Sequence, residues 1–381
     1  MNGKDKMLAA LSKEGTPEIP AVICYEGIFI RDHWDELSSY PWWYQFETDI
    51  DKQISWRHEV MERIDQDWTS LPTFYSNEEQ SQTRIELCND EVYLVNSITS
   101  TNRKLTKPHK SGWNPNGGVQ SLKPKNIIQT KDDIDQLIYP VDLTYPERFA
   151  KEGRNSLSKL LLKNSGSSLF PIVHISSPLW YCYQIWGFEG MMLALADHLE
   201  LIRYACEKFL EQRFVDIKIA KALGAQGIWV EECFTDMISP EHFKEINVPL
   251  ITQMTEAIRA EGMSSIYYYC GNPADRLDLI LSCQADAISL EESKKGFHID
   301  IDDVVDYVSG RCTVLGNLDT YDVLEKGTPE QLEHEVKRQI KAGKRNHGRF
   351  IMSLGSPVTP DTSVSRVRLY CDMVHELGKN A

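Results

Sequence analysis

Short apolar runs alternate with longer amphipathic stretches through the second half of the chain. Six of these runs are rich in β-forming residues and predict buried strands at 170–175, 227–232, 265–270, 287–291, 313–317 and 350–355. The amphipathic stretches between and after them predict helices at 189–199, 200–223, 240–261, 273–283, 301–309, 328–342 and 362–377. Strands and helices that alternate in this way are typical of βαβ units around a parallel sheet.

The front of the chain supplies two more strands. After a helix at 4–12, the apolar run 19–25 predicts a first strand, and a helix at 51–64 leads into a strand at 67–71. Two strands here and six later make eight, the number that closes a (β/α)8 TIM barrel, an α/β fold. Because no stretch has the composition of a linker, we predict a single barrel domain across residues 1–381.

One region has a different texture. Residues 83–88 and 91–95 alternate apolar and polar side chains on either side of Asn89-Asp90, which is the pattern of a β-hairpin with a tight turn. We therefore predict that residues 75–130 form a β-rich insertion off the barrel.

Composition and charge restrict the partners. The formal net charge of −15 opposes binding to nucleic acid, which depends on Lys and Arg side chains that neutralise phosphates. No apolar run reaches the ~20 residues that a membrane helix needs, and the first residues show no signal-peptide core. The nine cysteines are dispersed, as is typical of reduced thiols. We expect a cytoplasmic protein that binds neither nucleic acid nor membrane.

Reactive side chains gather where the predicted strands end. In a (β/α)8 barrel the carboxyl ends of the strands meet at one mouth, where active sites lie. Buried carboxylates at such a mouth are costly unless a cation, a proton or a cationic substrate completes them. The residues at these ends are His174, Ser176, Ser177, Glu231, Glu232, Cys233, Tyr268, Tyr269, Cys270, Glu291, Glu292, Asn317 and Ser356.

Each of these residues also has a plain structural interpretation. Adjacent residues of a strand point to opposite faces, so only one of Glu231 and Glu232 can face the mouth, and the same holds for Glu291 and Glu292. A single cysteine at a strand end is more often a small buried hydrophobe than a ligand. His174 could equally be a core histidine.

Three segments resemble a known family. They are Leu315-Gly316-Asn317-Leu318-Asp319, then Thr328-Pro329-Glu330-Gln331-Leu332 opening a helix, and Leu354-Gly355-Ser356-Pro357-Val358-Thr359-Pro360. In this spacing they resemble the uroporphyrinogen decarboxylase superfamily, well over residues 165–381 and weakly over 1–30. The porphyrin decarboxylases carry several arginines near the first strand, where this chain has only Arg31. The chain looks more like the corrinoid-dependent zinc methyltransferases of that superfamily, in particular those that demethylate methoxylated aromatics.

The resemblance implies a zinc site, and the sequence departs from its usual pattern. Where that branch has His-x-Cys-Gly, this chain has Tyr268-Tyr269-Cys270-Gly271, and Ser356 holds the position of a later cysteine. The thiol is kept and oxygen donors are available, which suits a zinc that acts as a Lewis acid on an ether oxygen. The metal ligands implied in this way are Glu232, Cys270 and Glu292.

We therefore expect a methyltransferase that moves a methyl group from a small substrate, a methoxylated aromatic in first place, to the Co(I) centre of a corrinoid (cobalamin) protein. The corrinoid must come from a separate partner, because the chain has no Asp-x-His-x-x-Gly motif. The proposed catalytic residues are Glu232 and Tyr268, and the proposed substrate-binding residues are His174, Trp180, Tyr269, Asn317 and Ser356. A metal-free decarboxylase or lyase, and a non-catalytic relative that binds a small ligand, stay open as alternatives, and a homodimer is compatible with the family.

Overall fold

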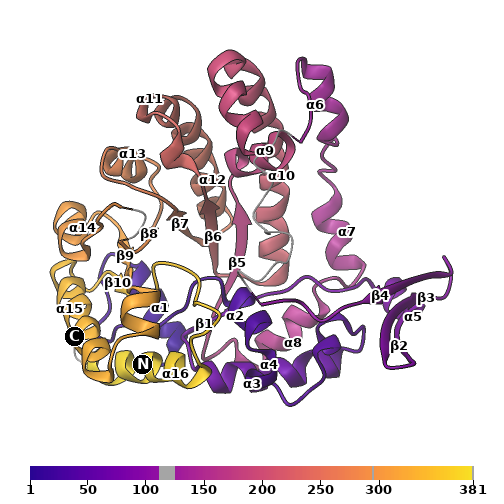
Figure 1. Cartoon of the computed structure of the whole chain (residues 1–381), viewed down its shortest axis with the longest axis horizontal. Coiled ribbons are helices and arrows are strands. Elements are labelled where there is room, and N and C mark those ends of the chain that lie inside the picture. The colour runs from indigo at the N-terminus through magenta and orange to yellow at the C-terminus, as the bar shows by residue number, and fades with distance from the viewer. Residues whose placement is uncertain (111–124, 294–295, 380–381) are drawn as a thin grey trace.

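A computed structural model describes residues 1–110, 125–293 and 296–379. Its main sheet has seven parallel strands in the order β1-β5-β6-β7-β8-β9-β10 (Figure 1). Their bounds are Trp68–Ser70 (β1), Phe170–Ser176 (β5), Gly227–Glu232 (β6), Ser264–Tyr269 (β7), Ala287–Leu290 (β8), Thr313–Leu315 (β9) and Phe350–Ile351 (β10). Each strand is followed by at least one helix before the next strand of this sheet, as the sequence predicted.

The predicted first strand is extended backbone that joins the two edges of this sheet. Met352 N donates to Pro20 O (2.9 Å) and Val22 N donates to Met352 O (2.9 Å), which pairs the segment with β10. On the other side, Asp67 N donates to Ala21 O (2.8 Å), next to β1. Residues 19–24 therefore take the eighth position, and the (β/α)8 prediction holds.

Most strand residues are buried on both faces, because the barrel interior lies on one side of the sheet and helices lie on the other. Every residue of β8, Ala287–Leu290, is buried. The helices that surround the strands are α1 (Gly3–Leu11), α2 (Glu26–Asp32), α3 (Trp34–Leu37), α4 (Ile50–Ile64), α8 (Ser156–Ser165), α9 (Pro178–Asp197), α10 (Leu199–Leu223), α11 (Pro240–His242), α12 (Val248–Ala260), α13 (Leu277–Ser282), α14 (Ile301–Val308), α15 (Pro329–Arg345) and α16 (Val364–Leu377).

The predicted hairpin is present and has a third strand. Strands β2 (Thr83–Cys88), β3 (Glu91–Asn96) and β4 (Thr101–Leu105) form an antiparallel sheet that projects from the side of the barrel in Figure 1. Asn89 and Asp90 both have positive φ (50° and 64°), as the tight turns of hairpins require. Helices α5 (Asn77–Gln82), α6 (Lys131–Leu137) and α7 (Tyr145–Lys151) complete this part of the chain.

The buried carboxylate of Asp67 connects helices near both ends of the chain to the extended segment 19–24. Asp67 accepts hydrogen bonds from Ala21 N (2.7 Å) and from Lys6 Nζ on α1 (2.8 Å), and His375 Nε2 on α16 lies 3.0 Å from it. Lys6 and Asp67 are both buried.

No helix among the described residues is long and apolar enough to cross a bilayer.

Candidate active site

The register of the strands identifies which side chains face the inside of the barrel. Ser176 pairs with Glu231, Glu231 with Tyr268, and Tyr268 with Ser289. Partners in a parallel ladder share a face, so these four side chains form one row across β5, β6, β7 and β8. Because side chains alternate along a strand, His174 and Trp229 lie one layer below this row on the same face.

Aromatic rings fill this lower layer. The Trp229 ring stacks on Tyr268 (centroids 4.9 Å apart, 26° between planes) and on His174 (5.7 Å, 17°). Trp68 meets Trp229 edge-on at 5.7 Å, and Tyr25 meets Tyr268 edge-on at 5.6 Å. These five residues, which we call the aromatic floor, belong to β1, β5, β6 and β7, except for Tyr25, which directly follows the segment 19–24.

Glu231 is the carboxylate of the mouth. Its Oε1 accepts a hydrogen bond from Tyr25 Oη (2.8 Å) and its Oε2 accepts one from Ser176 Oγ (3.1 Å). Burial first, and then the neighbouring Tyr268, Cys233 and Glu231, raise the pKa of Tyr25 well above its usual value, so this phenol keeps its proton. Tyr25 also has φ 53°, a left-handed conformation that costs energy for a bulky residue and that is often found at functional sites.

Two thiols lie beside this carboxylate. The register that pairs Glu231 with Tyr268 brings Cys233 opposite Cys270 on the adjoining strand ends. Cys233 Sγ is 3.9 Å from Glu231 Oε1. The neighbouring Cys270 thiol first, and then burial, raises the pKa of Cys233, so without a metal ion this thiol stays protonated.

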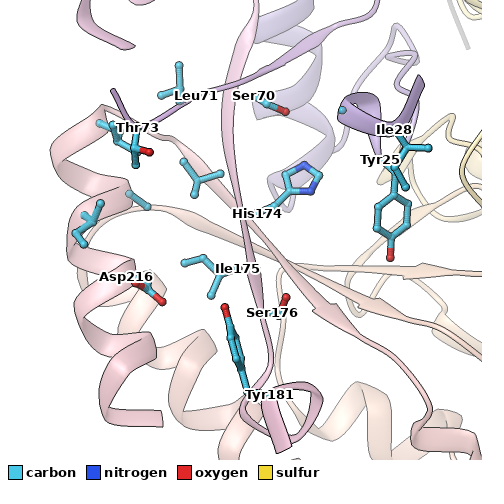
Figure 2. A pocket seen from close by; sticks show the side chains of 15 residues that line it. Tyr25, Ile28, Ser70, Leu71, Thr73, His174, Ile175, Ser176, Tyr181 and Asp216 are labelled. Carbon is cyan, nitrogen blue, oxygen red and sulfur yellow. The ribbon is translucent and has the colours of Figure 1, made fainter. Parts of the chain in front are cut away.

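A cavity of about 640 Å³ opens from this mouth. It passes through the barrel wall, because the pairing of β1 with β5 ends at Ser70 and Ile172 while β5 continues to Ser176. Figure 2 shows Tyr25 and His174 on one side of β5 and Asp216, on α10, on the other. The volume is that of a small-molecule site, for which ~300–1,000 Å³ is usual.

The cavity has no positive side chain at neutral pH among its described lining residues. Neither Lys nor Arg lines it, and the surrounding protein lowers the pKa of its histidine, His174, below the usual 6.5. Asp216 supplies a carboxylate, whose pKa burial raises while the charge of Arg213 lowers it in part. An anionic substrate would therefore meet no counter-charge from these residues.

Glu232, which the sequence analysis proposed as ligand and catalyst, faces the other way. Its Oε1 accepts from Ser177 Oγ (2.7 Å). Burial raises the pKa of Glu232 to about 8. Its Oε2 is buried and has no hydrogen-bond partner among the described residues, as expected for a carboxyl group that keeps its proton.

Of the other proposed site residues, Tyr268 and His174 belong to the aromatic floor, and Cys270 lies at the mouth. Tyr269 is on the outer face of β7, where it packs edge-on against Phe243 at 5.8 Å. Trp180 packs against Phe234 at 5.5 Å, and it is the next residue, Tyr181, that lines the cavity.

The remaining three lie on the rim formed by the loops after β8, β9 and β10. Asn317 Nδ2 donates to the backbone oxygens of Glu291 (3.1 Å) and Ile299 (3.0 Å), which braces the loop after β8. Glu292 is buried and accepts from Thr320 Oγ1 (2.9 Å). Ser356 O accepts from the Cys24 thiol (2.9 Å).

The sequence analysis missed Tyr25, Trp68 and Trp229 as site residues and left Glu231 as the second choice. Tyr25 and Trp229 could have been found, because each belongs to a predicted strand that leads to the mouth. The choice between the two glutamates could not, since β6 is apolar on both faces and the sequence does not say which face is inner.

Comparison with known proteins agrees with the barrel fold. A family model described as uroporphyrinogen decarboxylase (URO-D) matches residues 123–377. A uroporphyrinogen decarboxylase of Vesicomyosocius okutanii is 21% identical over 264 residues, which cover 68% of this chain and 72% of that one. The same enzyme of Chlorobaculum tepidum is 24% identical over 274 residues, 68% and 74% of the two chains. A solved structure, a methyltransferase from Methanosarcina mazei, superposes with a TM-score of 0.66 over 99% of both chains at 15% identity, a similarity of fold.

Proposed function

The chain belongs to the uroporphyrinogen decarboxylase family, and we propose that within this family it acts as a methyltransferase. In this proposal a small methylated substrate, a neutral methoxylated aromatic in first place, binds on the aromatic floor. The methyl acceptor is the Co(I) centre of a separate corrinoid protein, which docks over the mouth.

The observation that carries the proposal is the character of the cavity. Tyr25, His174 and Tyr181 give it aromatic walls, its lining has no Lys or Arg among the described residues, and the one acidic side chain that lines it is Asp216. A porphyrinogen with several acid arms would need cations to hold them, since unpaired charges are costly to bury. A neutral aryl ether needs only apolar contact and one proton donor.

The fold of the methyltransferase from Methanosarcina mazei supports the same choice, because it extends over the whole of this chain. The named decarboxylases match about two thirds of it. At these identities the relatives leave the substrate open, so we base the substrate class on the cavity.

Tyr25 provides the acid for the reaction, and Glu231 positions it. When the methyl carbon accepts an electron pair from Co(I), the methyl–oxygen bond breaks and its pair stays on the aryl oxygen. That oxygen then takes the proton of Tyr25, and the Tyr25 oxide recovers a proton from solvent, while Glu231 orients the Tyr25 hydroxyl through the 2.8 Å hydrogen bond. Because the pKa of Tyr25 is raised, the proton is present at neutral pH. Tyr25 and His174, the members of the aromatic floor that line the cavity, offer aromatic contacts to the ring of the substrate.

Zinc fits this site only in part. Cys233, Cys270 and Glu231 offer the sulfur and oxygen donors that zinc takes, and a bound zinc would supply Lewis acidity. However, Glu232 and Glu292 lie elsewhere, and among the described residues no three His, Cys, Asp or Glu side chains converge as a metal group. We therefore route no step through zinc, and its binding stays a prediction.

The test is a comparison of products. Purified protein is incubated anaerobically with cob(I)alamin and 2-methoxyphenol, and separately with uroporphyrinogen. We expect one catechol for each methyl group gained by cobalamin, and no carbon dioxide from uroporphyrinogen. Stoichiometric release of carbon dioxide, with no catechol, would contradict the proposal and favour the decarboxylase alternative.

A further inference from the structure

A second cavity, of about 580 Å³, lies at the opposite end of the barrel. Its lining includes Asp286, Cys312 and Arg349, which directly precede β8, β9 and β10. This is the amino-terminal end of the strands, so the cavity is separate from the mouth.

Positive side chains converge on this cavity. The charged residues that line it are Lys13, Arg259, Arg311, Arg349, Asp278 and Asp286, four cations against two carboxylates, in a chain whose net charge is −15. One of the carboxylates is already engaged, because Asp286 Oδ2 accepts from Ser265 N (2.8 Å) and Ser265 Oγ (2.9 Å). Its other oxygen is 3.7 Å from Arg259, a loose ion pair.

The cations of this cavity have few carboxylate partners, and the hydrogen bonds of its arginines go to backbone oxygens: Arg259 donates to Gln284 O (2.8 Å) and Arg311 to Val308 O (2.9 Å). Arg349 is only 8% exposed, donates through Nη1 to Gly310 O (2.7 Å), and has no partner for Nε among the described residues. Within the described chain, Lys13, Arg311 and Arg349 form no ion pair with a carboxylate, whereas Arg338 pairs with Asp300 and Glu335, each at 2.8 Å. A buried guanidinium without a counter-charge is costly unless a ligand completes it.

We propose that this cavity binds a small phosphorylated molecule. Guanidinium groups match phosphate oxygens with two parallel hydrogen bonds, and three arginines can approach one ligand here. Leu281 and Ala285 line the same cavity and offer an apolar contact for the organic part of the ligand. In barrels of this kind, residues at the amino-terminal face usually contribute to stability rather than to binding. Ion-paired side chains would be sufficient for that role. What favours a ligand here is the buried Arg349, which lines the cavity and forms no ion pair with a carboxylate among the described residues.

The test uses inorganic pyrophosphate as the probe, in calorimetric titrations of the full chain at constant ionic strength. The double variant Arg259→Gln/Arg311→Gln removes two cations whose side chains are near the surface. The matched control is Arg203→Gln on α10, because the Arg203 and Arg259 side chains are both 48% exposed and both paired to one carboxylate. We expect saturable binding of one pyrophosphate by the wild type and the control, and binding at least tenfold weaker in the double variant.

Circular dichroism and thermal melts check that each variant is folded, and Lys13→Gln gives an independent change if the double variant is not. Absence of saturable binding to the wild type, or equal weakening in the control, would overturn the proposal. Citrate that binds where pyrophosphate does not would overturn the phosphate class. None of these results bears on methyl transfer, because the two cavities lie at opposite ends of the barrel.

Discussion

Replacement of Asp67 by asparagine tests how the barrel is closed. The wild-type carboxylate lies within 2.7–2.8 Å of Lys6 Nζ through both oxygens, and it also accepts from the backbone N of Ala21. The Lys6 and Asp67 side chains are only 9% and 6% exposed. Asparagine has the same shape but no charge, so it leaves Lys6 as a buried cation without its counter-charge. Loss of one partner of a buried ion pair costs about 3–5 kcal/mol.

The assay is urea denaturation followed by tryptophan fluorescence, in which Trp68 reports on the strand next to the substitution. Asp65→Asn is the control, because Asp65 is 49% exposed and pairs with Arg368 at 3.1 Å. An exposed pair of this kind contributes ~1 kcal/mol or less. If Asp67→Asn destabilises no more than Asp65→Asn, the reasoning about barrel closure is refuted.

The pH dependence of this difference has a definite sign. Burial by itself raises the pKa of Asp67, but the hydrogen bond with His375 and the charge of Lys6 together bring it below the usual 3.8. A lowered carboxyl pKa gives stability that is complete above the unfolded value and is lost as the pH falls through the folded value. The advantage of wild type over Asp67→Asn should therefore be constant near neutrality and shrink below about pH 4.

Two further predictions concern the glutamate behind the sheet and the thiol at the mouth. Because the pKa of Glu232 is about 8 in the folded protein against 4.5 ordinarily, its contribution to stability is greatest below pH 4.5 and declines as the pH rises to 8. Glu232→Gln should remove that part of the decline in urea melts, and an unchanged pH profile would contradict the burial of this carboxyl. The sequence also predicts zinc binding. Elemental mass spectrometry of protein purified with zinc should find about one zinc per chain in the wild type and less zinc in Cys270→Ala. A folded wild type without zinc would remove the metal from the account and leave the acid-assisted reaction.

The sequence predicted the barrel because the inner strands are short apolar runs and most of the helices between them have an amphipathic face; α9, which is apolar around most of its surface, begins at Pro178 rather than at the predicted residue 189. It missed β4, Thr101–Leu105, since four of the five residues are exposed and no apolar alternation marks the strand. The opening in the barrel wall could not be predicted either. It depends on where the pairing of β1 with β5 stops, and pairing over three residues of β1 leaves no pattern in a single chain.

The candidate site was predicted as a set of strand ends but not as a geometry. Tyr268 and Cys270 lie on the inner face with Glu231, whereas Tyr269 and Glu232 lie on the outer face. Alternation along a strand means that the side chains of neighbouring residues point to opposite faces. Only the register with adjacent strands shows which of the two is inside the barrel. The hydrogen bond from Tyr25 to Glu231 joins residues 206 positions apart, and local sequence cannot show such a contact.

The most direct test of the central claim is the rate of methyl transfer from 2-methoxyphenol to cob(I)alamin in Glu231→Gln beside Glu232→Gln. The two glutamates are adjacent in sequence, but one faces the mouth and the other the helices. We expect the rate to fall about 100-fold or more in Glu231→Gln, which loses the carboxylate that positions the proton donor Tyr25, and to stay within about threefold of wild type in Glu232→Gln. Equal rates in wild type and Glu231→Gln, or loss of transfer in Glu232→Gln alone, would contradict the account.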